Sequence, residues 1–549
     1  MKPNFSYSLL LLAAAFATAT AEARIELPQV LSSGMVVQRN ANVPLWGIAD
    51  PGEQITVKVK NSKNKSVGAK KGYSTTADAS GKWELSIPAL PAGGPYTITL
   101  NDVVLSDVLS GDVLLCSGQS NMELQVSRTD DLLYDETSKY SNPNIRHFNT
   151  PNTYEFNTPK DDVNPTQWIA VTPESSRNFS ATAYFTAKEL YDRTGVPVGV
   201  IKTCWGGTPV EAWMSDEAIQ PFPRTMAIKA IANDAAYRDQ VNKTSAAGNR
   251  RWNVTLHSSD PGLQGNVKWF DPALDDSGWT MVDPVTNKCW ATDGYNPVNG
   301  SHWFRKEINL TKAQASGDAI LRMGCIVDAD SVFVNGKLVG TTAYQYPPRI
   351  YKVPASVLRE GRNNVTVRLI SQYGTGSFVA EKPYKLITAD GEVSLEGDWR
   401  YHLGVAMPNP PSGGETWFYK PTTLYNAMIH PFVKLPVAAA VWYQGESNVG
   451  RRNEYGPLLK AMIADWRKNF NQPEMPFYIV ELANFLHPSD KGGRAAWAEM
   501  RDVQKSVADE TPNTYLIKNY DLGEWNDIHP LNKKTLGERI AEAITSNTK

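Results

Sequence analysis

The order of apolar and polar residues changes its character three times along the chain. From residue 24 to residue 104, short segments such as 54–60 alternate apolar and polar side chains. Turn-forming clusters such as Asp50-Pro51-Gly52 separate these segments. Because a period of two places the apolar residues on one face of each strand, residues 24–104 are predicted to form a small β-sandwich.

Two later regions, residues 105–250 and 401–549, combine continuous apolar runs with segments of helical spacing. The run at 198–204 follows a helical pattern at 181–194, and the run at 436–443 precedes one at 455–469. Such alternation is typical of an α/β domain with parallel strands. Since the first region has too few strands to bury both faces of a sheet, we expect both regions to contribute to one sheet.

Residues 251–400 interrupt this α/β domain with a second β pattern. Asn335-Gly336 lies between two alternating runs and is a strong hairpin signal. The stretch resembles the jelly-roll, galactose-binding-like domain of many β-galactosidase-type enzymes, which implies sugar binding. A module that only covers the active-site side is an equally weighted alternative.

The first 23 residues predict a secretory signal peptide. They carry one lysine, an apolar run at 9–17 and small residues suited to cleavage, and the run is shorter than the ~20 residues that a membrane span needs. A net charge of −2 over 549 residues offers no basic face to nucleic acid or a membrane surface. We therefore expect an exported protein, periplasmic or secreted, without either partner. The pattern carries no signal for an oligomeric state.

The four cysteines form no CxxC pair, and the chain has no HExxH sequence, so neither a metal nor another cofactor is expected. Cys116 and Cys204 each end an apolar run just before a glycine-rich turn. They would meet if their strands were neighbours, and a disulfide and two buried free thiols are both compatible with this pattern.

The stretch at 111–125, GDVLLCSGQSNMELQ, carries the first candidate for chemistry. An apolar run closed by Gly118 and followed by a helical pattern is typical of a buried strand that turns into a helix. Ser120 then lies at the turn, where nearby N–H groups can stabilise an anion. A serine there is more often a helix cap than a nucleophile. The residues at the other strand ends must therefore show which role Ser120 has.

Three further polar clusters follow predicted strands or precede the last helix: Trp205-Gly206-Gly207, the block WYQGESN at 442–448, and Asn526-Asp527-Ile528-His529. The carboxyl ends of parallel strands lie at one edge of a sheet, so these clusters should converge on Ser120. His529 is then the predicted base, and Asp527 the carboxylate that fixes its tautomer. Amide donors in the block at 442–448 can complete an oxyanion hole.

Together these blocks resemble the sialate O-acetylesterase family, a branch of the SGNH-type hydrolases. The matching blocks are 118–122, 205–207, 442–448 and 527–530, in this order. The resemblance implies an SGNH-type α/β sandwich hydrolase domain with a parallel sheet, within a multidomain α/β plus β chain. It also implies a metal-independent serine esterase acting on O-acetylated sialic acid or another acetylated glycan.

The resemblance implies catalytic roles for Ser120, His529 and Asp527. The oxyanion would be held by the N–H groups of Ser120 and Gly207 and by the amide of Gln444, with Asn448 as the alternative. Contacts with substrate are expected from Asn121, Trp205, Glu446 and Arg451.

Two positions depart from the wider superfamily. There, the aspartate stands three residues before the histidine, where this chain has Asn526, and the amide residue is an asparagine after a glycine, whereas Gln444 precedes Gly445. His430 is a competing base, although Pro431 and its apolar neighbours favour a structural role.

Two alternative functions share these features. Acetyl-xylan esterases contain the same blocks, and two β regions rich in tryptophan and tyrosine fit a non-catalytic carbohydrate-binding protein, against which Ser120 and His529 argue. Sialic acid carries a carboxylate that an arginine would bind. Arg451 or Arg452, just after the amide block, would supply this arginine. The alternative is that both are solvent-exposed residues at the start of a helix.

Overall fold

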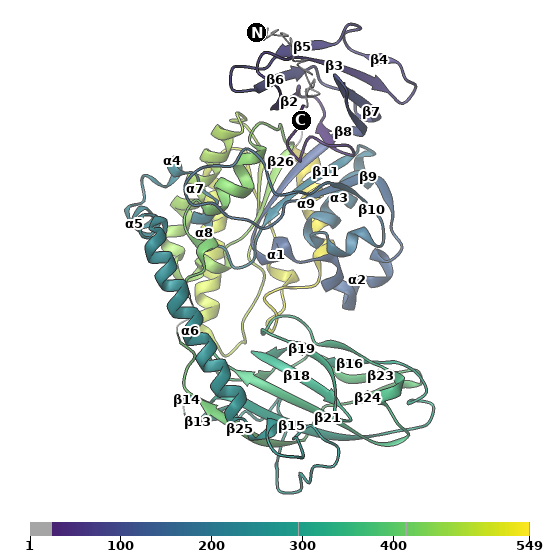
Figure 1. The fold of residues 1–549 in the computed structure, drawn as a ribbon, viewed down its shortest axis with the longest axis vertical. Helices are drawn as coiled ribbons and strands as arrows, with labels where there is room; N and C mark the ends of the chain where they lie inside the picture. Colours follow the sequence, from purple (N-terminus) through teal and green to yellow (C-terminus); the bar gives the residue numbers. More distant parts are fainter. Residues whose placement is uncertain (1–24, 295, 412–413, 548–549) are drawn as a thin grey trace, which may run out of the picture.

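Three regions succeed one another along the long axis of the molecule (Figure 1): N-terminal strands, a central α/β layer, and a second group of strands. The computed structural model describes residues 25–294, 296–411 and 414–547, so the predicted signal peptide lies outside the described residues. Within those ranges, no helix combines the length and the apolar composition needed to cross a bilayer.

The central sheet contains six parallel strands in the order β9 (Asn142–Asn149), β11 (Val198–Cys204), β8 (Val103–Gly118), β26 (Ala439–Tyr443), β27 (Phe477–Val480) and β28 (Thr514–Ile517). An antiparallel strand, β10 (Trp168–Val171), closes the β9 edge. β8 and β26, which come from either side of the intervening β strands, pair directly, with Gly118 opposite Tyr443. The prediction that both α/β regions build one sheet is confirmed.

Helices cover both faces of this sheet (Figure 1). Leu114 and Cys116 of β8 share a core with α3 (Ala181–Thr194) and α9 (Lys533–Asn547). Val113 and Leu115 share another with α7 (Arg452–Asn469) and α8 (Lys491–Glu510). Because both faces are covered, the strand reads as a continuous apolar run.

The N-terminal strands join the central sheet through β8 itself. β2 (Val43–Ile48) pairs with β6 (Lys82–Ile87), and β3 (Gln54–Asn61) pairs with β4 (Ser66–Val67), β5 (Tyr73–Thr76) and β7 (Gly93–Leu100). β7 and β1 (Val36–Gln38) pair with the first half of β8. The strand therefore runs without a break across residues 104 and 105, where the sequence suggested a boundary.

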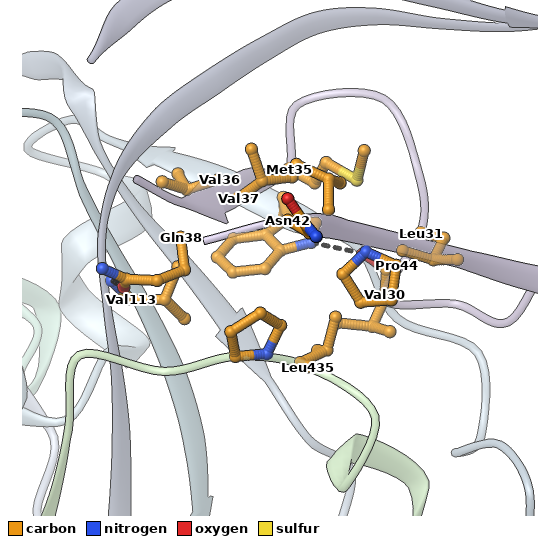
Figure 2. Close-up of a pocket in the computed structure, with 13 residues that line it drawn as sticks. Val30, Leu31, Met35, Val36, Val37, Gln38, Asn42, Pro44, Val113 and Leu435 are labelled. Carbon is orange, nitrogen blue, oxygen red and sulfur yellow. Dashed lines mark hydrogen bonds between the residues drawn. The ribbon is translucent and has the colours of Figure 1, made fainter. Parts of the chain in front are cut away.

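A small apolar cavity lies between the N-terminal region and the central sheet (Figure 2). Its volume is about 20 Å³, which is room for roughly one water molecule. Trp168 closes one side, and its indole N–H donates to the carbonyl of Val30 at 2.9 Å. This cavity is a packing gap rather than a substrate site.

The described part of residues 260–407, called the intervening β region below, contains two large antiparallel sheets and two two-stranded ones. One has the order β12 (Thr280–Val282), β25 (Trp399–Met407), β15 (Asn299–Leu310), β21 (Gly361–Ser371), β18 (Ala329–Val334) and β19 (Lys337–Thr342). The other has the order β20 (Ile350–Val353), β16 (Ala319–Met323), β23 (Tyr384–Thr388) and β24 (Gly391–Ser394). Their apolar residues share one core, which includes Phe304 and Leu386.

Two details of the intervening β region bear on the sequence predictions. Asn335 and Gly336 both have positive φ, 47° and 78°, and turn β18 into β19 as the hairpin signal predicted. Residues 251–259, expected in the β pattern, instead end the long helix α6 (Ala235–Ser259). This helix runs from the central layer to the intervening β region (Figure 1).

Shorter elements complete the described chain. The helices are α1 (Ser120–Glu123), α2 (Asp130–Thr137), α4 (Asp216–Ile219) and α5 (Pro223–Asn233), and the two-residue strands are β13 (Thr292–Asp293), β14 (Asn296–Pro297), β17 (Ile326–Val327) and β22 (Ser377–Phe378).

Candidate active site

Ser120 lies at the carboxyl end of β8, the strand at the centre of the sheet. The strand ends at Gly118, whose φ is +136° and where a Cβ atom would lie 2.1 Å from the carbonyl oxygen of Tyr443. A glycine is therefore required for β26 to approach so closely. Ser120 then starts α1, which is a single turn, so individual N–H groups rather than a helix dipole must stabilise an anion here.

His529 lies next to this turn because the loop before α9 is tied to it. The amide Nδ2 of Asn121 donates to the carbonyl of Ile528 at 2.9 Å, which joins the neighbour of Ser120 to the neighbour of His529. Only 8% of His529 is exposed. Among the described residues, neither of its ring nitrogens has a hydrogen-bond partner.

The environment of His529 keeps its imidazole neutral. Burial, together with the positive charges of Lys533 and Arg128, lowers its pKa to about 3. The ring of Tyr346 meets it edge to face, with 5.3 Å between ring centroids. A neutral imidazole with free ring nitrogens is the form that accepts a proton.

Asp527 contacts the backbone of His529 rather than its ring. Its Oδ1 accepts the N–H of His529 at 2.9 Å, and its Oδ2 lies 3.3 Å from Nζ of Lys382 in the intervening β region. Burial raises the pKa of Asp527, although the charge of Lys382 lowers it. Asn526, at the position where the superfamily has its aspartate, donates to the carbonyl of Ala380 at 2.8 Å. Both side chains therefore fasten the histidine loop.

The glycine pair after β11 lies against the turn at residues 118–121, which carries the candidate nucleophile Ser120 and is called the nucleophile turn below. The N–H of Gly206 donates to Oε2 of Glu123 at 2.7 Å, and a Cβ atom on Gly206 would lie 3.4 Å from Cβ of Ser120. Gly207 has a φ of +77°, and a Cβ atom there would lie 1.8 Å from the hydroxyl oxygen of Tyr419. In the described part of the chain, no group accepts the N–H of Ser120 or Gly207. Both are available to an oxyanion.

Gln444 and Asn448 lie behind the site with their amides already engaged. Both side chains are fully buried. Nε2 of Gln444 donates to Oε1 of Gln119, the carbonyl of Thr208 and Oδ1 of Asn448, at 3.2, 3.1 and 2.8 Å. Asn448 also accepts the N–H of Val210 at 3.0 Å. These contacts favour a bracing role for both amides, which the sequence assigned to the oxyanion hole.

Asn121 and Glu446, expected to contact substrate, belong to a buried polar chain beneath Ser120. Asn121 donates to Oε1 of Glu446 at 2.6 Å and accepts from Nζ of Lys533 at 2.7 Å. Burial raises the pKa of Glu446 and lowers that of Lys533 to about 7. Because Asn121 is only 2% exposed and both polar atoms of its side chain are bonded, its contacts favour a positioning role.

The last two expected substrate contacts differ in their surroundings. Trp205 is half-buried and stacks on Phe418 with 3.9 Å between ring centroids, beside the glycine pair. Arg451 binds Glu211 and Glu454 through Nη1, so its charge is already neutralised within the protein.

Of the remaining sequence candidates, His430 lies away from the nucleophile turn, whereas the two cysteines lie in the strands that lead to it. Nδ1 of His430 donates to the carbonyl of Lys160 at 2.9 Å, and His430 lines a cavity beside the N-terminal region, to which no residue of the nucleophile turn contributes. Cys116 and Cys204 are buried free thiols, and burial raises the pKa of both.

Several residues at the site carried no signal in the sequence. Tyr346 and Lys382 come from the intervening β region, Tyr419 from the segment that follows it, and Lys533 from the last helix. Each stands in an ordinary strand, turn or helix pattern, and only the packing of distant segments brings it to the site. Of these residues, only Lys533 could have been found from the sequence, because it follows His529 by four residues.

Comparisons with known proteins give matches over much of the chain. The family model described as "Carbohydrate esterase, sialic acid-specific acetylesterase" matches residues 110–256 and 408–546, which is more than half of the chain. Sialate O-acetylesterase of Rattus norvegicus is 24% identical over 539 residues, which cover 92% of this chain and 70% of the rat protein. The human sialate O-acetylesterase is 29% identical over 212 residues, which span only 39% of its length and 35% of this chain.

Among solved structures, a carbohydrate acetylesterase from Xanthomonas citri is similar in fold. It is 23% identical, the match covers 95% of this chain and 74% of that protein, and the TM-score is 0.55.

Proposed function

Because this chain belongs to the carbohydrate esterase family of sialic acid-specific acetylesterases, we propose that it is a serine esterase that removes O-acetyl groups from sialic acid. The observation that carries the proposal is the bond from Asn121 to the carbonyl of Ile528, since it holds a neutral, buried histidine beside the serine at the end of the central strand.

In the proposed reaction, Ser120 Oγ attacks the acetyl carbonyl carbon while the neutral imidazole of His529 takes its proton. The C=O electrons move to the oxygen, where the N–H groups of Ser120 and Gly207 stabilise the negative charge. The intermediate then collapses, the sugar hydroxyl leaves with the proton from the imidazolium, and an acetyl-Ser120 ester remains. Water, deprotonated by His529, attacks this ester and releases acetate.

Asp527 supports this chemistry indirectly in the proposal. By accepting the N–H of His529 it fixes the backbone that carries the imidazole. Its negative charge also lies close enough to stabilise the imidazolium as it forms. The buried amides of Gln444 and Asn448 hold the glycine pair in register with the nucleophile turn.

We also propose the finer architecture and the location suggested by the sequence. The N-terminal strands are a β-sandwich, and the two antiparallel sheets with one shared core support a jelly roll inserted into an SGNH-type esterase domain. The boundaries expected from the sequence are 24–104, 105–250, 251–400 and 401–549, after a signal peptide at 1–23 that directs export. We keep them in this proposal, except that the inserted region is taken as residues 260–407, because α6 ends at Ser259 and β25 ends at Met407.

The test is acetate release from O-acetylated N-acetylneuraminate compared with acetylated xylan. Ser120→Ala should lower kcat by several orders of magnitude and abolish labelling by a serine-directed phosphonate, with an unchanged melting temperature. Ser106→Ala, on the same strand but at its exposed far end, is the matched control and should behave as wild type. Near-normal turnover by Ser120→Ala would refute the proposal, and faster turnover of xylan would reassign the substrate.

A further inference from the structure

Arg128 is a half-buried cation at the active site without an acidic partner. It lies in the short helical turn Val126–Thr129, which directly follows the nucleophile helix. Its Nη2 reaches the carbonyl of Tyr346 only at 3.5 Å, the long limit of a hydrogen bond. Its Nε is buried and has no partner among the described residues. A buried donor on a charged group is costly when it is unpaired, so a ligand that satisfies it gains that free energy.

The two aspartates that follow Arg128 in the next turn, and Asp527 of the histidine loop, are already bound to other cations. Asp130 pairs with Arg177, and Asp131 pairs with Arg322 of the intervening β region. Asp527 is held by Lys382 and by the N–H of His529. No salt bridge of the described residues includes Arg128, which sets it apart from Arg451 with its two glutamates.

Tyr346 connects Arg128 to the catalytic histidine. The carbonyl of this residue contacts the guanidinium, while its ring lies edge to face with the imidazole of His529. The charge of Arg128 also contributes to the lowered pKa of His529, which agrees with this proximity. Arg128 therefore lies on the side of His529 that faces the intervening β region, near where the sugar that carries the acetyl group would lie.

We infer that Arg128 binds the carboxylate of an acidic O-acetylated sugar and so selects sialic acid over neutral acetylated glycans. The inference rests on the proposed esterase function and gives a residue to its substrate preference. A guanidinium presents parallel N–H donors that match a carboxylate in a bidentate pair. Partial burial strengthens such a pair, because water competes less well for either charge.

The first test measures binding apart from catalysis. In the Ser120→Ala protein, calorimetry compares free N-acetylneuraminate with its methyl ester, which has the same sugar but no charge. We expect the acid to bind more tightly than the ester. In this background, Arg128→Gln should lower the affinity for the acid by about 10- to 100-fold and leave the affinity for the ester unchanged. Arg128→Lys keeps the charge but loses the two parallel N–H donors, so its affinity for the acid should lie between those of Arg128 and Arg128→Gln.

The second test uses the active enzyme. Arg128→Gln should raise KM for O-acetylated N-acetylneuraminate by about 10-fold or more relative to KM for the methyl ester of the same sugar, so the ratio of the two KM values carries the effect. Arg362→Gln removes an exposed arginine of the intervening β region, paired with Glu307, and is the matched control.

Equal affinity for the acid and the ester in the Ser120→Ala protein would overturn the inference without any arginine variant, even if Arg128→Gln failed to fold. An unchanged ratio of the two KM values in a folded Arg128→Gln enzyme would overturn it as well. Absence of acetate release from every acetyl ester would instead refute the esterase function, whereas a carboxylate preference in binding would still support Arg128 as the anchor.

Discussion

Asp527→Asn separates two ways in which this carboxylate could serve His529. In a triad where the carboxylate holds the imidazole, the amide imposes the wrong tautomer and typically costs about 10⁴ in kcat. In this structure Asp527 instead accepts the backbone N–H of His529 and pairs with Lys382. The oxygen of an asparagine can still accept that N–H, so the two arrangements predict different losses.

The structure gives the size of the expected loss. A hydrogen bond to a charged acceptor contributes about 1.5–3 kcal/mol and one to a neutral acceptor about 1 kcal/mol, so the amide should cost about 1 kcal/mol, or roughly 5- to 10-fold in kcat. Lys382 keeps Glu524 as a partner at 2.9 Å, so its charge is not left alone. Asp527→Ala removes the acceptor altogether and should cost about 100-fold.

The assay is kcat on a small acetyl ester for Asp527→Asn and Asp527→Ala, with the unfolding free energy of each measured in urea. Glu524→Gln is the matched control, since it removes the other carboxylate bound to Lys382 without touching the backbone of His529. Similar losses of 10³ or more in both Asp527 variants, with wild-type stability, would refute the backbone role and show that the carboxylate acts on the ring.

Three further predictions concern the residues around Ser120. The pKa of His529 is about 3 in the folded protein and about 6.5 when unfolded, so only the unfolded state binds a proton there as pH falls below 6.5. The unfolding free energy should therefore decrease as pH falls from 6.5 towards 3, and it should decrease less in His529→Asn. The acid limb of the kcat/KM profile should likewise lie below about pH 5, and a limb near pH 6.5 would contradict this. Lys382→Met leaves Asp527 without its cation and should destabilise the protein by about 1–3 kcal/mol in urea unfolding and lower kcat, whereas Lys385→Met, at a surface pair with Glu392, should do neither. Gly207→Ala places a methyl group 1.8 Å from the Tyr419 hydroxyl and should lower kcat by about 10²- to 10³-fold; adding Tyr419→Phe should recover part of it, and no recovery would argue against this clash.

The sequence by itself determined the sheet and placed Ser120 at the end of its central strand. A continuous apolar run is what a strand covered on both faces requires, so β8, β11 and β26 could be recognised without coordinates. A glycine is needed after such a run where a neighbouring strand comes too close for a Cβ atom, as the carbonyl of Tyr443 does at Gly118. Ser120, Gly207 and His529 follow strands or precede a helix, where local patterns are informative.

Tertiary structure alone decided which polar side chains are already hydrogen-bonded within the protein. The amide of Gln444 stands at a strand end, as an oxyanion donor would, but its partners are supplied by Gln119 and Thr208, which are 325 and 236 residues away in sequence. A hydrogen bond depends on the direction of a side chain to within tens of degrees, and a residue pattern carries no such information.

The same reason applies to the arginine expected to bind a carboxylate. Arg451 follows the amide block and seemed well placed for a carboxylate, yet Glu211 and Glu454 occupy it. Arg128 is without an acidic partner because Arg177 and Arg322 take the aspartates beside it, and Arg322 comes from the intervening β region. Charge pairing across the fold depends on which distant segments meet, and only the packed chain determines that.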